Sequence, residues 1–215
     1  MSILWKLARL IPSAEPARGH SMVNYARRAS IVVAASVVVV LAAGTAQAGP
    51  WSASIYGGPA SNNRFSDIVE GRFHVSDAMV GLAVNGDLVN LGWKTTLAAE
   101  AQVTEYVGGQ SYTTGALGMG LRFHDFPWRG ASLAIYTGPS YALNPPHVPD
   151  YFYGPSYRMR KFLNYTSIEL AVPIPYHERH WDAVFRIYHR SGAWGVYSIN
   201  VDEGSMIGFG IRAKF

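Results

Sequence analysis

Apolar and polar residues alternate with a period of two along most of the chain after Gly49. Every second side chain then points to the same face, which is typical of a half-buried β-strand. Helical patterns rich in Leu, Lys and Glu are missing. We therefore predict an all-β domain of eight strands, near residues 51–56, 80–84, 93–104, 116–123, 132–136, 167–172, 181–191 and 207–215.

Several of these segments carry charges on the face opposite the apolar one. A water-soluble sandwich would turn that charged face outward. A small transmembrane barrel turns it inward, where charges pair across a filled lumen. An even number of antiparallel strands suits the transmembrane barrel, and charges of both signs favour a plugged lumen over a conducting pore. The charged positions are Lys94, Glu100, Arg122, Glu169, Asp182, Arg186, Arg212 and Lys214.

One apolar run, Ile31 to Ala43, precedes all the predicted strands and is followed by Ala46-Gln47-Ala48. Basic residues before the run and small residues after it are typical of a cleaved export signal. The alternative is a single transmembrane anchor, but the run is shorter than the roughly 20 residues that a helix needs to cross a bilayer. We predict a signal peptide at residues 1–48, starting at Met1 or Met22, and a barrel domain at residues 49–215.

The location and the excluded chemistries follow from composition. Export, the terminal aromatic residue Phe215 and the abundance of Trp and Tyr favour the bacterial outer membrane, where aromatic residues line both interfaces. The leader accounts for the whole net charge of +4, so the barrel domain has no polybasic stripe for nucleic acid. The absence of cysteine excludes disulfides, zinc–thiolate sites and a cysteine nucleophile.

The topology follows if both termini lie in the periplasm. Periplasmic turns are then expected at Asn85-Gly86-Asp87, His124–Gly130 and Pro175–His180. The outer loops are expected near Pro59–Asp77, Tyr106–Ser111, Asn144–Arg160 and Gly192–Gly204.

A histidine and a serine lie together at the outer end of the seventh predicted strand. By parity, His189 and Ser191 share the apolar, lipid-facing side with Ile187. A serine hydroxyl is a poor nucleophile unless a base takes its proton, and an imidazole is the usual base. The pair is therefore a candidate catalytic site.

A third group should hold the imidazole in the correct tautomer. Glu203 lies twelve residues after Ser191 and has the parity of Ile207, so it can stand at the same rim. Asp202 is the alternative if the preceding loop shifts the register.

An eight-stranded outer-membrane barrel with His-x-Ser on its penultimate strand resembles the lipid A 3-O-deacylases. That family carries a Ser–His–Glu triad on the outer face of its barrel. The resemblance therefore implies Ser191 as nucleophile, His189 as base and Glu203 as acid. It covers the last two strands in sequence and the rest in architecture. The family's Asn directly after the serine, which helps to hold the oxyanion, is Gly192 here, so a backbone N–H of Gly192 or Gly195 is expected to replace it.

The sequence thus predicts a serine ester hydrolase that removes an acyl chain from lipid A, with lipid A or lipopolysaccharide as its partner. The alternative is a non-catalytic barrel that binds lipopolysaccharide or stabilises the envelope. No metal, nucleotide or other cofactor is implied. Arg158, Arg160 and Lys161 form a basic cluster beside the third outer loop, which is either a site for lipid phosphates or an ordinary charged rim.

Overall fold

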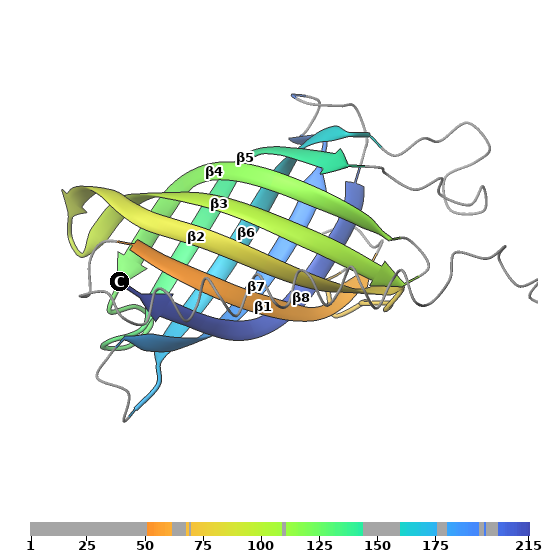
Figure 1. The fold of residues 1–215 in the computed structure, drawn as a ribbon. Helices are drawn as coiled ribbons and strands as arrows, with labels where there is room; N and C mark the ends of the chain where they lie inside the picture. The colour runs from red at the N-terminus through yellow and green to blue at the C-terminus, as the bar shows by residue number, and fades with distance from the viewer. Residues whose placement is uncertain are drawn as a thin grey trace, which may run out of the picture.

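The chain closes into a single β-barrel (Figure 1). A computed structural model describes residues 51–61, 68, 70–108, 111–143, 160–175, 180–193, 196 and 202–215, with the backbone alone at 202 and 203. Each strand is antiparallel to its neighbours in sequence, and the first pairs with the last. The strands are β1 (Trp51–Ser61), β2 (Asp77–Gly92), β3 (Thr95–Gly108), β4 (Tyr112–His124), β5 (Ser132–Leu143), β6 (Phe162–Pro173), β7 (Trp181–Ser191) and β8 (Asp202–Lys214).

This architecture confirms the predicted all-β, up-and-down barrel of eight strands. The predicted signal peptide at residues 1–48 lies outside the described residues. In the described part of the chain, no helix has the length and apolar character needed to cross a membrane.

The two faces of the barrel wall differ in chemistry, as the alternation predicts. The outward positions carry large apolar side chains that are exposed, among them Val84, Val103, Leu117, Met119, Ile135, Phe209 and Ile211. An apolar belt of this extent is stable only when lipid, instead of water, covers it. The barrel wall is therefore a membrane-spanning surface.

The lumen holds the predicted charges, and they are paired. Arg186 donates to Glu100 at 2.6 Å and also to Glu169, and all three side chains are fully buried. Arg212 continues the network to Glu169 at 2.9 Å and to Asp182 at 2.5 Å. Opposite charges at such distances offset the cost of removing each of them from water.

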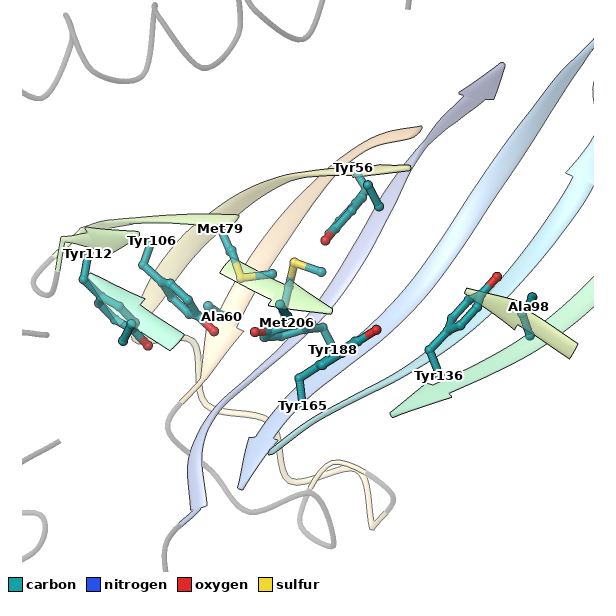
Figure 2. Packing of buried hydrophobic residues seen from close by; sticks show 14 residues of the cluster. Tyr56, Ala60, Met79, Ala98, Tyr106, Tyr112, Tyr136, Tyr165, Tyr188 and Met206 are labelled. Carbon is teal, nitrogen blue, oxygen red and sulfur yellow. The ribbon is translucent and has the colours of Figure 1, made fainter. Parts of the chain in front are cut away.

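Aromatic and sulfur-containing side chains fill the rest of the lumen (Figure 2). The Tyr106 and Tyr112 rings stack with their centroids 4.2 Å apart, and the Arg186 guanidinium lies 4.5 Å from the Tyr56 ring centroid. Gly81 makes room for the Tyr56 ring, because a Cβ at that position would overlap the ring. The lumen is thus a packed core, in agreement with the predicted plug.

The turn predicted at Asn85-Gly86-Asp87 is wrong. β2 continues through these residues, and Trp51 and Ser52 of β1 pair with Gly86 and Asn85. The Asn85 side chain is buried in the lumen, where its Oδ1 accepts a hydrogen bond from Ser52 Oγ at 2.6 Å. A tertiary contact therefore overrides the local turn preference of Asn-Gly.

The actual turn between β2 and β3 lies at Trp93 and Lys94, which both have positive φ angles, 54° and 58°. Lys94 was expected in the lumen, but it is exposed and its Nζ lies 2.8 Å from Asp125 Oδ2 in the next turn. The length of β2 depends on its pairing with the neighbouring strands, which its own sequence does not reveal. The turn therefore ends at Lys94, seven residues after Asp87, where the predicted turn ended.

The remaining connections lie where the alternation predicts them. The stretch His124–Gly130 joins β4 to β5, and Pro175–His180 joins β6 to β7. These short turns share one end of the barrel with Trp51 and Phe215, whose N–H donates to the Trp51 carbonyl at 3.0 Å. We call this the turn end. The predicted outer loops fall between the strands at the opposite end, which we call the loop end.

Candidate active site

The strand register places His189 and Ser191 on the outer face of the barrel, as predicted. Directly paired residues of antiparallel strands share a face. Ile187, two residues before His189, pairs with Ile168 of β6 and Ile207 of β8, both on the apolar exterior. The intervening Tyr188 is fully buried in the lumen. The histidine and the serine therefore lie on the lipid-facing wall, towards the loop end.

Both residues belong to a group of polar side chains that interrupts the apolar exterior. Across neighbouring strands, Thr137 pairs with Thr166, and Thr166 pairs with His189. His189 pairs with Ser205, which in turn pairs with Ser61. A second pair joins Asn164 to Ser191. We call this group the exterior polar patch: Ser61, Thr137, Asn164, Thr166, His189, Ser191 and Ser205. Polar groups on a lipid-facing wall are costly away from the interfaces, so a patch that spans five strands calls for a function.

The histidine has a defined partner on β8. His189 Nδ1 lies 2.8 Å from Ser205 Oγ, a normal hydrogen-bond length. His189 is 6% exposed and Ser205 is fully buried, so the contact is shielded from water. Ser205 is not among the site residues that the sequence predicts. Its parity with Ile207 placed it on the outer face, but its position opposite His189 depends on the register between β7 and β8.

Ser191 is the last residue of β7 and is partly exposed. Its Oγ accepts a hydrogen bond from the Ala193 N–H at 3.4 Å, and among the described residues no hydrogen bond joins it to His189. Side chains two residues apart on one strand have Cα atoms about 6.5–7 Å apart.

The predicted acid lies where the register of β8 shifts. His189 pairs with Ser205, but Ser191 pairs with Asp202, so β8 contains one extra residue between these two pairs. Gly204 within this bulge has a φ of 79°, a conformation that favours glycine. The register thus brings the backbone of Asp202 opposite Ser191, while Glu203 lies at the bulge. The side chains of both acids lie outside the described part, so Glu203 stays a prediction, with Asp202 as its alternative.

The other predicted site residues lie around the same rim. Gly192 follows Ser191 directly and is buried, whereas Gly195 and Arg158 lie outside the described residues. Arg160 and Lys161 precede β6 and are exposed. Their backbone carbonyls accept hydrogen bonds from Arg190 Nη2 at 3.5 and 3.2 Å, which attaches the basic segment to the lumen side of β7.

The patch also contains an amide that sequence reasoning missed. Asn164 of β6 contacts Thr137 and Thr166 through its side chain, at 3.1–3.2 Å. It is 8% exposed. Nothing in the local sequence marks this residue, because its proximity to Ser191 comes from the pairing of β6 with β7.

The described residues contain no group of three or more His, Cys, Asp or Glu side chains arranged to hold a metal ion. The chemistry that the patch offers is that of a histidine, hydroxyls and an amide, which are the groups used in serine hydrolysis.

No protein-family profile and no curated protein matches the chain. Among solved structures, it is similar to the N-terminal β-barrel domain of Pseudomonas aeruginosa OprF, with 15% identity and a TM-score of 0.44 over 79% of this chain and 100% of that one. It is also similar to the Yersinia pestis outer membrane protein Ail, with 13% identity and a TM-score of 0.41 over 76% of this chain and 99% of that one.

Proposed function

We propose that this barrel is an outer-membrane serine ester hydrolase that removes an acyl chain from lipid A. Ser191 is the nucleophile and His189 is the base. Glu203, or Asp202 in its place, is the acid of the triad and acts on His189 through the Ser205 hydroxyl, which contacts Nδ1. The observation that carries the proposal is the position of His189 and Ser191 on the lipid-facing wall, within the exterior polar patch. A group that acts on a membrane lipid must face the membrane, whereas a group that acts on a soluble substrate has no reason to.

The reaction needs only groups that the chain supplies. His189 Nε2 takes the proton of Ser191 as Oγ attacks the ester carbonyl carbon, and the carbonyl electrons move to oxygen. The tetrahedral intermediate collapses, the bond from carbon to the sugar oxygen breaks, and His189 returns the proton to that oxygen. Water then attacks the acyl-enzyme by the same route. The balance is one ester and one water converted to an alcohol and a fatty acid.

The exterior wall also offers space for an acyl chain. An apolar groove of about 730 Å³ crosses the wall of β1 to β6, and Val103, Leu117, Tyr141 and Phe162 line it. Its β6 edge at Phe162 lies two residues from Asn164, the register partner of Ser191. The exposed side chains of Arg160 and Lys161 at the same edge suit the phosphates of lipid A. The proposed site for the lipid A phosphates and the proposed site for its acyl chain would thus both lie beside Ser191.

Mass spectrometry of lipid A tests this proposal. Cells that express the wild type should lose one 3-hydroxyacyl chain from lipid A, and Ser191→Ala and His189→Ala should each retain the intact lipid. Ser54→Ala, which removes a buried serine hydroxyl from the lumen face of β1, is the matched control and should act like the wild type. The heat-dependent gel mobility of the barrel shows that each variant has folded. If lipid A stays intact in cells that contain the folded wild-type protein, the hydrolase proposal is wrong.

The second candidate is a non-catalytic barrel that binds lipopolysaccharide or stabilises the envelope. Two features favour it. Ser191 accepts from Ala193 and has no hydrogen bond to His189 within the described residues, and the residue after Ser191 is Gly192. For this candidate, Ser191→Ala leaves lipid A unchanged relative to the wild type, while removal of the Arg160 and Lys161 charges weakens retention of lipopolysaccharide during purification.

A further inference from the structure

Acyl transfer to a serine requires a donor for the carbonyl oxygen, which becomes negatively charged in the transition state. Such donors must lie 2.7–3.1 Å from the oxyanion, and they contribute most when they are already in place. Ser191 ends its strand, and the residue after it, Gly192, has no side chain that could donate. A side-chain donor for this site must therefore come from a neighbouring strand.

The neighbouring strand β6 supplies one such group. Asn164 is the register partner of Ser191, and both lie on the exterior face. Directly opposite residues of an antiparallel pair have Cβ atoms about 4.5–5.5 Å apart, within reach of an amide side chain. On the other flank the register partner of Ser191 is Asp202, whose residue type accepts hydrogen bonds when it is ionised and so cannot stabilise an oxyanion.

Two threonines position the amide of Asn164. Thr137 Oγ1 lies 3.2 Å from Asn164 Oδ1 and 3.1 Å from Nδ2, and Thr166 Oγ1 lies 3.2 Å from Nδ2. The single proton of the Thr137 hydroxyl can go to Asn164 Oδ1 or to the Tyr165 carbonyl oxygen, which lies 3.1 Å away. When it goes to Oδ1 and Thr166 accepts from Nδ2, one of the two amide protons is left for another acceptor. A buried amide with that spare proton, beside a nucleophile, is arranged to donate.

We propose that Asn164 Nδ2 donates to the oxyanion that forms when Ser191 attacks an acyl carbonyl. This inference rests on the proposed function and adds a catalytic residue to it. As the bond from Oγ to the carbonyl carbon forms, the π electrons move to oxygen and the Ser191 proton moves to His189. The Asn164 N–H then binds the negative oxygen, and it releases that oxygen when the carbonyl re-forms and the sugar oxygen leaves.

The experiment uses purified, folded full-length protein in mixed detergent–lipid micelles. Turnover of lipid A and the rate at which a fluorophosphonate probe labels Ser191 are both measured, because the phosphonyl oxygen in that reaction needs the same donor. Asn164→Ala should lower kcat by about 10²- to 10³-fold and slow labelling, with KM nearly unchanged. Asn164→Asp keeps the shape but replaces the donor by an acceptor, so it should be at least as slow.

Thr113→Ala is the control. Thr113 is an exterior polar residue at the loop end of β4, hydrogen-bonded to Glu105, and its loss should change neither rate. Wild-type rates in a folded Asn164→Ala variant, with Ser191→Ala inactive, would overturn the role of Asn164 and leave the hydrolase intact. Wild-type turnover in Ser191→Ala, or a wild type that neither cleaves lipid A nor reacts with the probe, would overturn both proposals.

Discussion

His189 Nδ1 and Ser205 Oγ lie 2.8 Å apart on the lipid-facing side of β7 and β8. The two residues are direct register partners, so the backbone pairing itself holds the imidazole against the hydroxyl. A hydroxyl can donate to Nδ1 or accept from it, so this contact sets the orientation of the ring. In the proposed hydrolase, Ser205 is therefore a positioning residue for His189.

Ser205→Ala should loosen the orientation of the His189 ring and lower the activity of the proposed hydrolase. Loss of one neutral hydrogen bond costs about 0.5–1.5 kcal/mol, which corresponds to a decrease in kcat of up to about tenfold. The ¹⁵N chemical shift of His189 Nδ1 should change, because this nitrogen loses its hydroxyl partner, a change that a loss of stability elsewhere in the barrel would not produce. Ser54→Ala on the lumen face should leave this shift unchanged, and an unaltered ¹⁵N spectrum in Ser205→Ala would refute the positioning role.

Arg186→Met should destabilise the barrel strongly. The substitution leaves the buried Glu100 without the guanidinium that now binds it at 2.6 Å, while Glu169 keeps Arg212. Breaking one side of a buried ion pair costs about 3–5 kcal/mol. Urea unfolding in phospholipid vesicles, followed by tryptophan fluorescence, measures the loss.

The double variant Arg186→Met/Glu100→Gln is the control for that prediction. It also removes the negative charge of Glu100, which Arg186→Met alone leaves unpaired, so it should recover a substantial part of the lost stability. Equal unfolding midpoints for the single and double variants would show that the ionic contact between Arg186 and Glu100 is not the cause.

Gly81→Ala should disturb the lumen, whereas Gly115→Ala should not. A Cβ on Gly81 would overlap the Tyr56 ring, which is fixed by its contacts with Gln102 and Arg186. Overpacking of this kind costs about 1–3 kcal/mol. A Cβ on Gly115 meets nothing within 4 Å. The same vesicle assay compares the two variants, and a Gly81→Ala barrel as stable as Gly115→Ala would contradict the packing described here.

The turn end should show a pH dependence at Asp125. Lys94 Nζ at 2.8 Å and the Gly130 N–H at 2.7 Å hold the pKa of the Asp125 carboxyl below its ordinary value. A lowered pKa in the folded state means that the stabilisation is present at neutral pH and is lost as the pH falls through that pKa. An NMR titration of the Asp125 carboxyl carbon should therefore give a lower midpoint in the wild type than in Lys94→Met. Identical midpoints would exclude Lys94 as the cause.

Much of the site could be read from the strand parity of single residues. His189 and Ser191 fall on the exterior because each lies an even number of positions from Ile187, and this rule needs no partner strand. Asn164 and Ser205 were missed because their roles depend on which residue lies opposite, a property of two strands together. The prediction of a turn at Asn85-Gly86-Asp87 was wrong for a related reason. The buried contact of Asn85 with Ser52 extends β2 through a sequence that favours a turn.

The period-two alternation by itself determined that this chain makes about eight strands, each with one apolar and one charged face. The two faces belong to each strand alone, so this information is local, whereas the predicted export signal and the abundance of Trp and Tyr were needed to indicate that the charged face turns inward. Only the tertiary structure decided the register, the bulge at Gly204 and hence which polar side chains meet His189 and Ser191. Register is a cooperative result of closing the barrel around a packed lumen, where the fit of Arg186, its acids and the tyrosines favours one alignment of the strands over the others.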